Sequence, residues 1–428
     1  MEQFTFTGKQ KTLSTILMII GVLCMIMTYV SYPEGHHARF WTNFLHNSVF
    51  FTGIAFISFY LLCAHTLAYS GWHTLLKRLI ESFGLFLPIG AIFFLILWFG
   101  TTNGMHHLYH WAEEGITDPM SDNYDRIIAG KAPLLNKTMY LILTVGLIVF
   151  WSLFVMKIRS LSKAADNGDN DLATYKKTKF WMAIFMPVGA FTSAFFIWLS
   201  VMSIDAHWYS TMFAWYASAS WLVSACALLA LFVIYLNGQG YLNQLNQSHR
   251  HDLGKYIFAF SVFWTYVWFD QFMLIWYANV GEETIYFNTR LKTFKVLFFL
   301  NLGINFLLPF FVLMRNSTKW KIGSLGFVAI CVFFGHWLDF FMMIKPGIYT
   351  TMGHNHGNGD AHGELISEAG HHSAALIDLG WQLPGLLEIG TMLGFLGLFL
   401  FVVFTGLSRA TLITKNDPYF EESLHHHA

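Results

Sequence analysis

Four ionisable carboxylates lie inside strongly apolar segments of this sequence. Asp270 lies within TYVWFDQFMLIW, Asp339 within FFGHWLDFFMMI and Glu388 within LPGLLEIGTMLG, while Glu81 begins the apolar stretch ESFGLF. Charged side chains are costly in hydrocarbon, so they usually face a bundle interior, a water path or a ligand. Proton or redox chemistry is therefore the leading interpretation.

Most of these groups are predicted to lie towards one membrane face. At about 1.5 Å per residue, Asp270 and Asp339 lie roughly 25 Å along their expected helices, in the outer third of the membrane. His336 precedes Asp339 by three residues, so the two share a helix face. A carboxylate and an imidazole at one depth can bind the oxygens of a quinol and accept its protons.

The predicted quinone or proton site has five candidate residues. They are Asp205, Asp270, His336, Asp339 and Glu388. The alternative is a polar cluster whose hydrogen bonds only hold the helices together.

A second set of polar residues defines a candidate inner proton path. It consists of His65, Glu81, Ser200 and Ser203. Hydroxyl groups with intervening waters would relay protons between Glu81 and the outer cluster. In the alternative, the small hydroxyl residues pack helices closely and bond to their own backbones.

The elements that must position these residues are transmembrane helices. Hydrophobic residues make up 55% of the 428 residues and charged residues only 12%, whereas a soluble chain carries about 25% charge. The apolar runs are long enough to cross hydrocarbon and lack the alternation of a barrel strand. They cover residues 12–32, 43–69, 79–101, 136–157, 177–202, 211–237, 254–279, 290–315, 322–344 and 384–408. The sequence predicts an all-α integral membrane protein with about ten transmembrane helices.

The spacing of these runs suggests an internal repeat of four helices. Two four-helix bundles are expected, flanked by the first and last helices. The predicted units are an N-terminal helix and outer loop (1–42), a first bundle (43–210), a second bundle (211–344), and an outer loop, last helix and tail (345–428). With both termini cytoplasmic, 17 of the 25 Lys and Arg residues fall in inside segments, and Lys345 falls in an outer one.

The sequence offers little to ligate a cofactor. Its four cysteines show no CxxC spacing, which argues against a disulfide framework and a ligated cluster. His46, His65 and His336 lack depth-matched partners, which argues against bis-histidine haem. The His-rich outer segments lack a fixed metal-ligand spacing, so a solvated loop is expected there, with metal binding as the alternative. Zero net charge without a basic tract gives no reason to expect nucleic acid.

Two long segments are expected outside the membrane, at 102–135 and 345–383. Such segments suggest docking to an extracytoplasmic partner, with solvated connections as the alternative. Segment 102–135 is the better candidate, because it holds Tyr109, Trp111 and Tyr124.

Three motifs carry a resemblance to a known family. SIDAHWYST at 203–211 resembles the SLDPHWYST signature of the ActF membrane subunit of alternative complex III, a relative of the NrfD/PsrC-like proteins. WFDQFMLIWYANVGEE at 268–283 is similar to that family's FSQFLIIWYANLPEE, and GHWLDFFMMIKPG at 335–347 to RWVDLYWLVMP. Asp270 stands where the family has Ser, and His336 where it has Arg.

The resemblance implies a subunit of a quinol:cytochrome c (or other high-potential acceptor) oxidoreductase in the bacterial inner membrane. Such a subunit supports assembly and binds a quinone such as menaquinone or conducts protons, without being catalytic in isolation. The implied partners are a homologous membrane subunit, extracytoplasmic subunits that hold the haem and iron–sulfur groups, and lipids. A proton-coupled secondary transporter is the alternative, since transporters also have repeated halves and broken helices.

Overall fold

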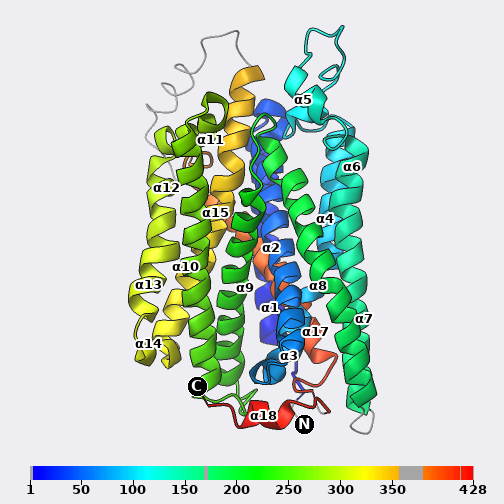
Figure 1. Cartoon of the computed structure of the whole chain (residues 1–428), viewed down its shortest axis with the longest axis vertical. Helices are drawn as coiled ribbons and strands as arrows, with labels where there is room; N and C mark the ends of the chain where they lie inside the picture. Colours follow the sequence, from blue (N-terminus) through cyan, green and yellow to red (C-terminus); the bar gives the residue numbers. More distant parts are fainter. Residues whose placement is uncertain (1–2, 168–171, 356–378, 415, 428) are drawn as a thin grey trace.

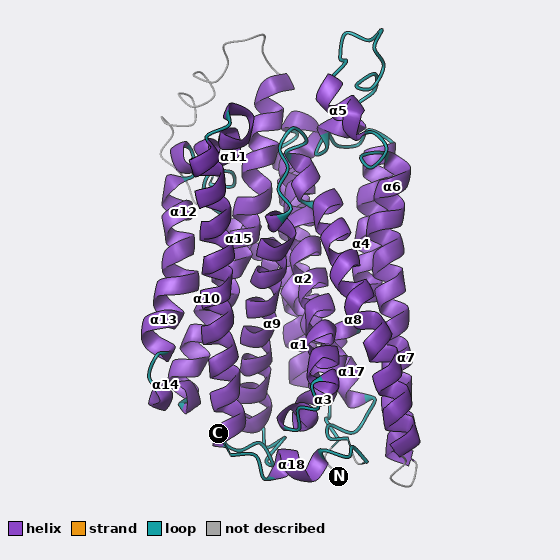
Figure 2. Cartoon of the chain, in the orientation of Figure 1, coloured by secondary structure: helices purple, strands orange, loops and turns teal. Residues whose placement is uncertain are grey.

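The computed structural model describes residues 3–167, 172–355, 379–414 and 416–427. Ten helical spans in this part are long and apolar enough to cross a membrane. The described residues form helices and loops without a strand (Figure 2). The predicted all-α, multi-pass membrane fold is thus confirmed. Helices form here because hydrocarbon holds no water, so each backbone group must bond within its own segment.

The ten spans are joined by connections of unequal length, of which those after α4 and α15 are the longest. In chain order they are α1 (Gly8–Ser31), α2 (Glu34–Leu67), α3 with α4 (Lys77–Gly84, Leu87–Thr102), α6 with α7 (Lys137–Leu141, Leu147–Asn167), α8 (Leu172–Ser200), α9 (Met212–Gly238), α10 (Gln247–Ala278), α12 with α13 (Lys295–Leu302, Leu308–Leu313), α15 (Ile322–Asn355) and α17 (Leu386–Ser408). Single turns of π-helix, η3 (Ile142–Gly146) and η5 (Gly303–Leu307), interrupt two of them.

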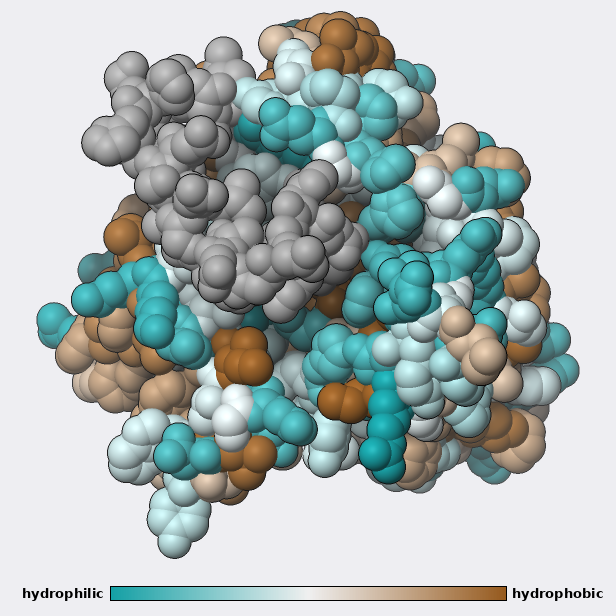
Figure 3. Space-filling model, turned by 90° about the horizontal axis from the view of Figure 1, so that it is seen from above, coloured by the Kyte–Doolittle hydropathy of each residue, from teal (hydrophilic) through white to brown (hydrophobic). Residues whose placement is uncertain are grey.

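Short helices lie at the two ends of the molecule (Figure 1). They are α5 (Arg126–Lys131) and α11 (Gly281–Lys292) at one end, and α14 (Asn316–Trp320) and α18 (Phe420–Leu424) at the other. Both chain termini lie at the α18 end, which is called the inner end below, and the opposite end is the outer end. Seen from the outer end, hydrophilic residues cover much of the described surface (Figure 3).

The spans pack as two groups of four and one pair. In the first group, α2 contacts α3, α4 and α8, while α7 contacts α4 and α8. In the second group, α9 contacts α10 and α15, while α13 contacts the same two helices. The long helix α2 also packs on α9 and α15, so it joins the two groups. The pair consists of α1 and α17.

Glycines bring α1 and α17 together. A Cβ atom on Gly21 would lie 2.3 Å from the Cα atom of Gly394, and one on Gly394 would lie 2.5 Å from the Cα of Gly21. Side chains at these positions would force the helices apart. Such close approach at small residues is a common basis of helix association in lipid, where apolar surface alone gives little preference for protein over lipid.

Two helices extend beyond their predicted ends. Helix α2 begins at Glu34 and α15 continues to Asn355, so both run across the domain boundaries predicted at 42/43 and 344/345. Lys345, expected in an outer loop, lies inside α15 and is fully buried. Asp339 is consequently about 17 Å from Thr350, where the span ends, and nearer the middle of its helix than expected. Residues 356–378 of the predicted His-rich loop lie outside the described residues.

The outer segment 102–135 packs on its own bundle. Tyr109 and Trp111 are buried, and Tyr109 Oη donates a hydrogen bond to the carbonyl of Ser200 at 2.9 Å. Lys131 Nζ donates to the carbonyl of Ala206 at 2.6 Å. These contacts order the segment without a second protein, so docking by a partner stays a prediction.

Asp125 is the N-cap of α5, near the end of the outer segment 102–135. Its Oδ1 atom accepts hydrogen bonds from the amides of Ile127 and Ile128, at 2.8 and 3.1 Å, which caps α5. Burial raises the pKa of Asp125, but the hydrogen bonds from His207 and from the two amides lower it, and the net pKa lies below its ordinary value.

We expect Asp125→Ala to destabilise α5 locally by about 1 kcal/mol and to accelerate hydrogen exchange across Arg126–Lys131. Because the folded-state pKa is depressed, the stabilisation by Asp125 is present above the ordinary carboxyl pKa and is lost as pH falls through the folded value. Asp122→Ala, at an exposed position nearby, is the control. Equal exchange in both variants would contradict this role.

Candidate proton-transfer site

The second helix group holds a fully buried carboxylate. Asp339 of α15 has no exposed surface. Its Oδ2 atom accepts a hydrogen bond from Trp264 Nε1 at 2.8 Å, and its Oδ1 atom accepts one from Asn301 Nδ2 at 2.7 Å and a short one from Tyr216 Oη. These donors come from α10, α12 and α9. All four spans of the group therefore meet at this carboxylate.

The donor set suits an ionised carboxylate. Such a group only accepts hydrogen bonds, and Asp339 receives three. The carboxylate is therefore held by one side chain from each of the three other spans of its group.

Two asparagines connect the carboxylate to the π-helical turn η5. Asn305, within η5, donates from Nδ2 to Asn301 Oδ1 at 2.6 Å, so the amide of Asn301 is oriented with its nitrogen towards Asp339. A π-helical turn inside an α-helix often occurs at a functional site. Sequence reasoning missed Asn301 and Asn305, although two amides four residues apart in the apolar run NLGINF are a detectable signal.

His336 extends the polar network towards the inner end. Its Nδ1 atom lies 2.9 Å from Ser220 Oγ and 3.9 Å from Asp339 Oδ2. Its Nε2 atom is buried and has no hydrogen-bond partner among the described residues. The predicted shared face of His336 and Asp339 is thus observed, and α9 supplies the hydroxyl that orients the imidazole.

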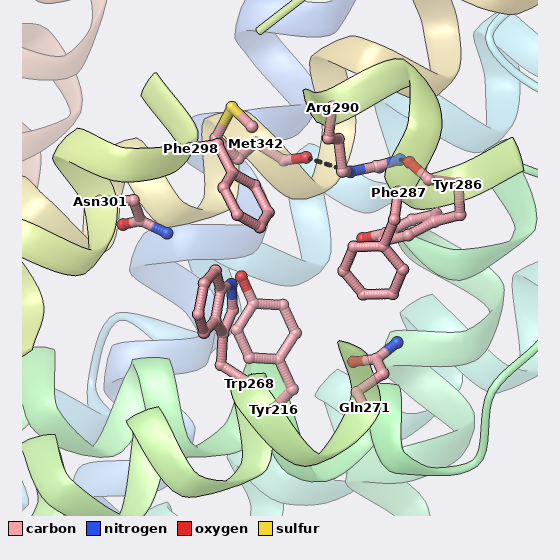
Figure 4. Close-up of a pocket in the computed structure, with 9 residues that line it drawn as sticks. All are labelled: Tyr216, Trp268, Gln271, Tyr286, Phe287, Arg290, Phe298, Asn301 and Met342. Atoms are coloured by element: carbon pink, nitrogen blue, oxygen red, sulfur yellow. Dashed lines mark hydrogen bonds between the residues drawn. The ribbon is translucent and has the colours of Figure 1, made fainter. Parts of the chain in front are cut away.

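A small cavity adjoins the network on its outer side (Figure 4). Tyr216 and Asn301, which bond to Asp339, line it together with Gln271 and Arg290. The cavity volume is about 20 Å³, which is room for about one water molecule. Gln271 is buried, and its Nε2 atom lacks a partner among the described residues. A water in the cavity would satisfy that donor.

Arg290 connects this cavity to Asp205 at the outer end of the first helix group. Its NH2 atom lies 3.4 Å from Asp205 Oδ2, and its Nε atom donates to the carbonyl of Met342 at 3.0 Å. Burial raises the pKa of Asp205, Arg290 lowers it, and the net pKa lies above its ordinary value. Asp205 follows the span that ends at Ile204. The cavity therefore lies between a carboxylate inside the membrane and one at its edge.

The structure does not bring Asp270 into this network. Asp270 is half-buried on α10, and no hydrogen bond or ion pair reaches it from the described parts of the chain. Six residues separate it from Trp264, which turns it by roughly 120° around the helix from the bonded face. The structure thus places Asp270 on another face of α10 from the residue that bonds to Asp339.

Glu388 belongs to a separate buried ion cluster. It receives hydrogen bonds from Arg39 Nε at 2.8 Å and Asn43 Nδ2 at 2.9 Å. Lys345 Nζ lies 3.9 Å from the same carboxylate, beyond hydrogen-bond distance, and 4.6 Å from the ring centroid of Trp381. Two buried cations thus share one carboxylate at the outer end of α17.

The residues of the candidate inner path bond within their own segments. Ser200 and Ser203 donate to the carbonyls of Phe196 and Leu199 in their own helical segment, both at 2.6 Å. Glu81 lies 3.3 Å from Arg78. The backbone bonds agree with the alternative interpretation, and a relay through intervening waters stays a prediction.

Two histidines lie together at the inner end of α2. The rings of His65 and His73 stack with their centroids 5.2 Å apart, and the ring of Tyr256 on α10 meets that of His65 edge-on with the centroids 5.4 Å apart. His65 Nε2 and His73 Nδ1 are buried without hydrogen-bond partners among the described residues. His65 belongs to the first helix group, whereas His336 and Ser220 lie in the second.

The first helix group contains a related arrangement without the carboxylate. Its third span carries the π-helical turn η3, as the third span of the second group carries η5. Beside η3, Tyr140 and Tyr109 lie with their hydroxyl oxygens 3.2 Å apart. A π-helical turn therefore occurs in the third span of both groups.

No family model matches this sequence, and no curated protein matches it significantly. Among the residues that the structure describes, no group of three or more His, Cys, Asp or Glu side chains has the arrangement of a metal site. Two observations therefore bear on function: the geometry around Asp339, and the three sequence motifs.

Proposed function

We propose that this chain is an ActF-type membrane subunit of a respiratory quinol-oxidising complex in the bacterial inner membrane. Within that complex its second helix group conducts protons through Asp339. Quinol oxidation and electron transfer take place in partner subunits, which hold the haem and iron–sulfur groups.

The buried Asp339 network carries this proposal. A carboxylate with no exposed surface, held by Tyr216, Trp264 and Asn301, is costly within a membrane and commonly marks an ion or proton pathway. The adjoining cavity supports the same interpretation, because one water between Asn301 and Arg290 would extend a hydrogen-bonded chain towards Asp205. Protons would leave Asp339 by this route.

The three motifs that resemble the ActF family meet in this region. The first supplies Asp205 and Trp208. The ring of Trp208 stacks on that of Tyr286, with the ring centroids 3.9 Å apart. The second supplies Trp268 and Gln271, which line the cavity. The third supplies His336 and Asp339. Segments far apart in the sequence thus converge on one polar site, which supports a shared role for them.

The cavity size favours proton transfer over two other roles. A volume of about 20 Å³ accommodates a water but is far smaller than a pocket for a quinone ring, since ligand pockets measure about 300–1,000 Å³. A secondary transporter would also need room for its solute near the bilayer midplane. We therefore assign protons, and not quinone or solute, to this interior site.

Purification from native membranes in mild detergent tests the assembly. The proposal predicts co-purification with haem and iron–sulfur subunits and quinol oxidation by the purified assembly. Visible absorption, electron paramagnetic resonance and a quinol oxidation assay measure these properties. A monodisperse lone chain that transports a solute with protons would support the transporter instead.

A further inference from the structure

A basic groove lies at the inner end of the molecule, away from Asp339. Arg159 and Lys163 of α7 and Arg409 after α17 line it. Its volume is about 390 Å³. The other lining residues are mostly half-buried or apolar: Leu85, Phe401, Val402, Thr405 and Gly406.

The two basic side chains at the edge of this groove have no ion-pair partner among the described residues. Lys163 is half-buried and Arg409 exposed, and neither forms an ion pair with any described residue. The carboxylates nearby in sequence, Glu81 and Asp166, bond to Arg78 instead. Among the described residues, no acidic side chain lines the groove, although the charge of the buried Glu81 acts on Arg159 and Lys163. An anion in the groove would therefore meet cations that no described carboxylate contacts directly.

Arg159 forms the rigid wall of the groove. It is 6% exposed, its NH1 atom donates to Ser82 Oγ at 3.2 Å, and its NH2 atom donates to the carbonyl of Gly406. These bonds tie α7 to α3 and α17, so the groove is preformed. Lys163 and Arg409 lie at its edge and are the side chains available to a ligand.

The groove lies at the inner ends of two membrane-spanning helices, where lipid headgroups are expected. Lys163 lies four residues before the end of α7, and Arg409 directly follows the last residue of α17. The apolar side chains of Leu85, Phe401 and Val402, which also line the groove, form a wall beside these cations. Basic pockets between transmembrane helices at this level suit anionic phospholipids, with the phosphate on the cations and the acyl chains along the apolar wall.

We propose that this groove binds the headgroup of an anionic phospholipid, a phosphodiester attached to acyl chains. The inference does not depend on the proposed function, since a membrane protein of any activity could hold such a lipid. The lipid would bridge α7 and α17 and thus connect the first helix group to the α1–α17 pair.

Native mass spectrometry of the delipidated protein tests this inference. The probes are phosphatidylglycerol, phosphatidylcholine with the same acyl chains, and soluble glycerol 3-phosphate. We expect phosphatidylglycerol to bind more tightly than phosphatidylcholine, and glycerol phosphate not to bind. Lys163→Gln and Arg409→Gln should each weaken phosphatidylglycerol binding about five-fold, and both together roughly 25-fold, because each basic side chain near an anionic lipid contributes about one such factor.

Lys157→Gln is the matched control. Lys157 lies on the same helix but is exposed and sits over the ring of Trp181, outside the groove. Its substitution should leave binding unchanged. Equal binding of the two lipids, unaltered binding by the double variant, or binding of glycerol phosphate as tight as that of phosphatidylglycerol would each overturn the proposal. Thermal unfolding of the lipid-free variants checks that they remain folded.

Discussion

Replacing Glu388 with Gln should lower the free energy of unfolding by about 3–5 kcal/mol, because it removes a carboxylate that lies beside two buried cations. Arg39 is 2% exposed and Lys345 is fully buried. Gln can still accept a hydrogen bond from Arg39, but it carries no charge. The loss should be measured by chemical unfolding of the purified protein in detergent.

Two further variants separate charge from packing at this cluster. Glu388→Gln combined with Lys345→Met removes one unpaired cation, so it should recover part of the lost stability. Glu421→Gln, at a side chain that is 80% exposed, should change stability by less than about 0.5 kcal/mol. If Glu388→Gln behaves like Glu421→Gln, the buried cluster does not stabilise the fold.

Asp339→Asn should slow proton translocation by the assembled complex roughly 100-fold, since a positioned acid or base typically contributes factors of 10²–10⁴. The amide has nearly the shape of the carboxylate but cannot carry a proton. Proton release per quinol oxidised, followed with a pH dye in liposomes, measures the effect.

Asp270→Asn is the control for this experiment. It makes the same chemical change on a neighbouring helix, outside the hydrogen-bonded network. Proton translocation should be unchanged in this variant. Size-exclusion chromatography should show an intact assembly for both. If both variants translocate protons normally, Asp339 has only a structural role.

Hydropathy predicted the helices because each span must be about 20 apolar residues long to cross hydrocarbon. The same reasoning predicted that Asp339 and His336 would lie on one face, since that relation depends only on helical spacing. These are local properties, and local properties can be read from a single sequence.

The partners of Asp339 could not be predicted, because they come from other helices. Tyr216, Trp264 and Asn301 are 123, 75 and 38 residues away in the chain. Which face of each helix turns inward depends on the packing of the whole bundle. Asp270 shows the same limit, since helical rise gives its position along α10 but not its rotation away from the network.

Lys345 shows why a charge is a poor marker of a helix end. The apolar run was expected to end at residue 344, which placed Lys345 in an outer segment. In the structure α15 continues, since Glu388 lies 3.9 Å from Lys345 Nζ and Trp381 and Phe341 face the cation. Tertiary contacts with α17 offset the cost of burying the charge.

Redox-induced infrared difference spectroscopy of the purified assembly tests the central claim most directly. If Asp339 gains and loses a proton during turnover, adding quinol should produce a carboxyl C=O band that is absent from Asp339→Asn and retained in Asp270→Asn. A spectrum without such a band, or one whose band persists in Asp339→Asn, would contradict proton transfer at this carboxylate.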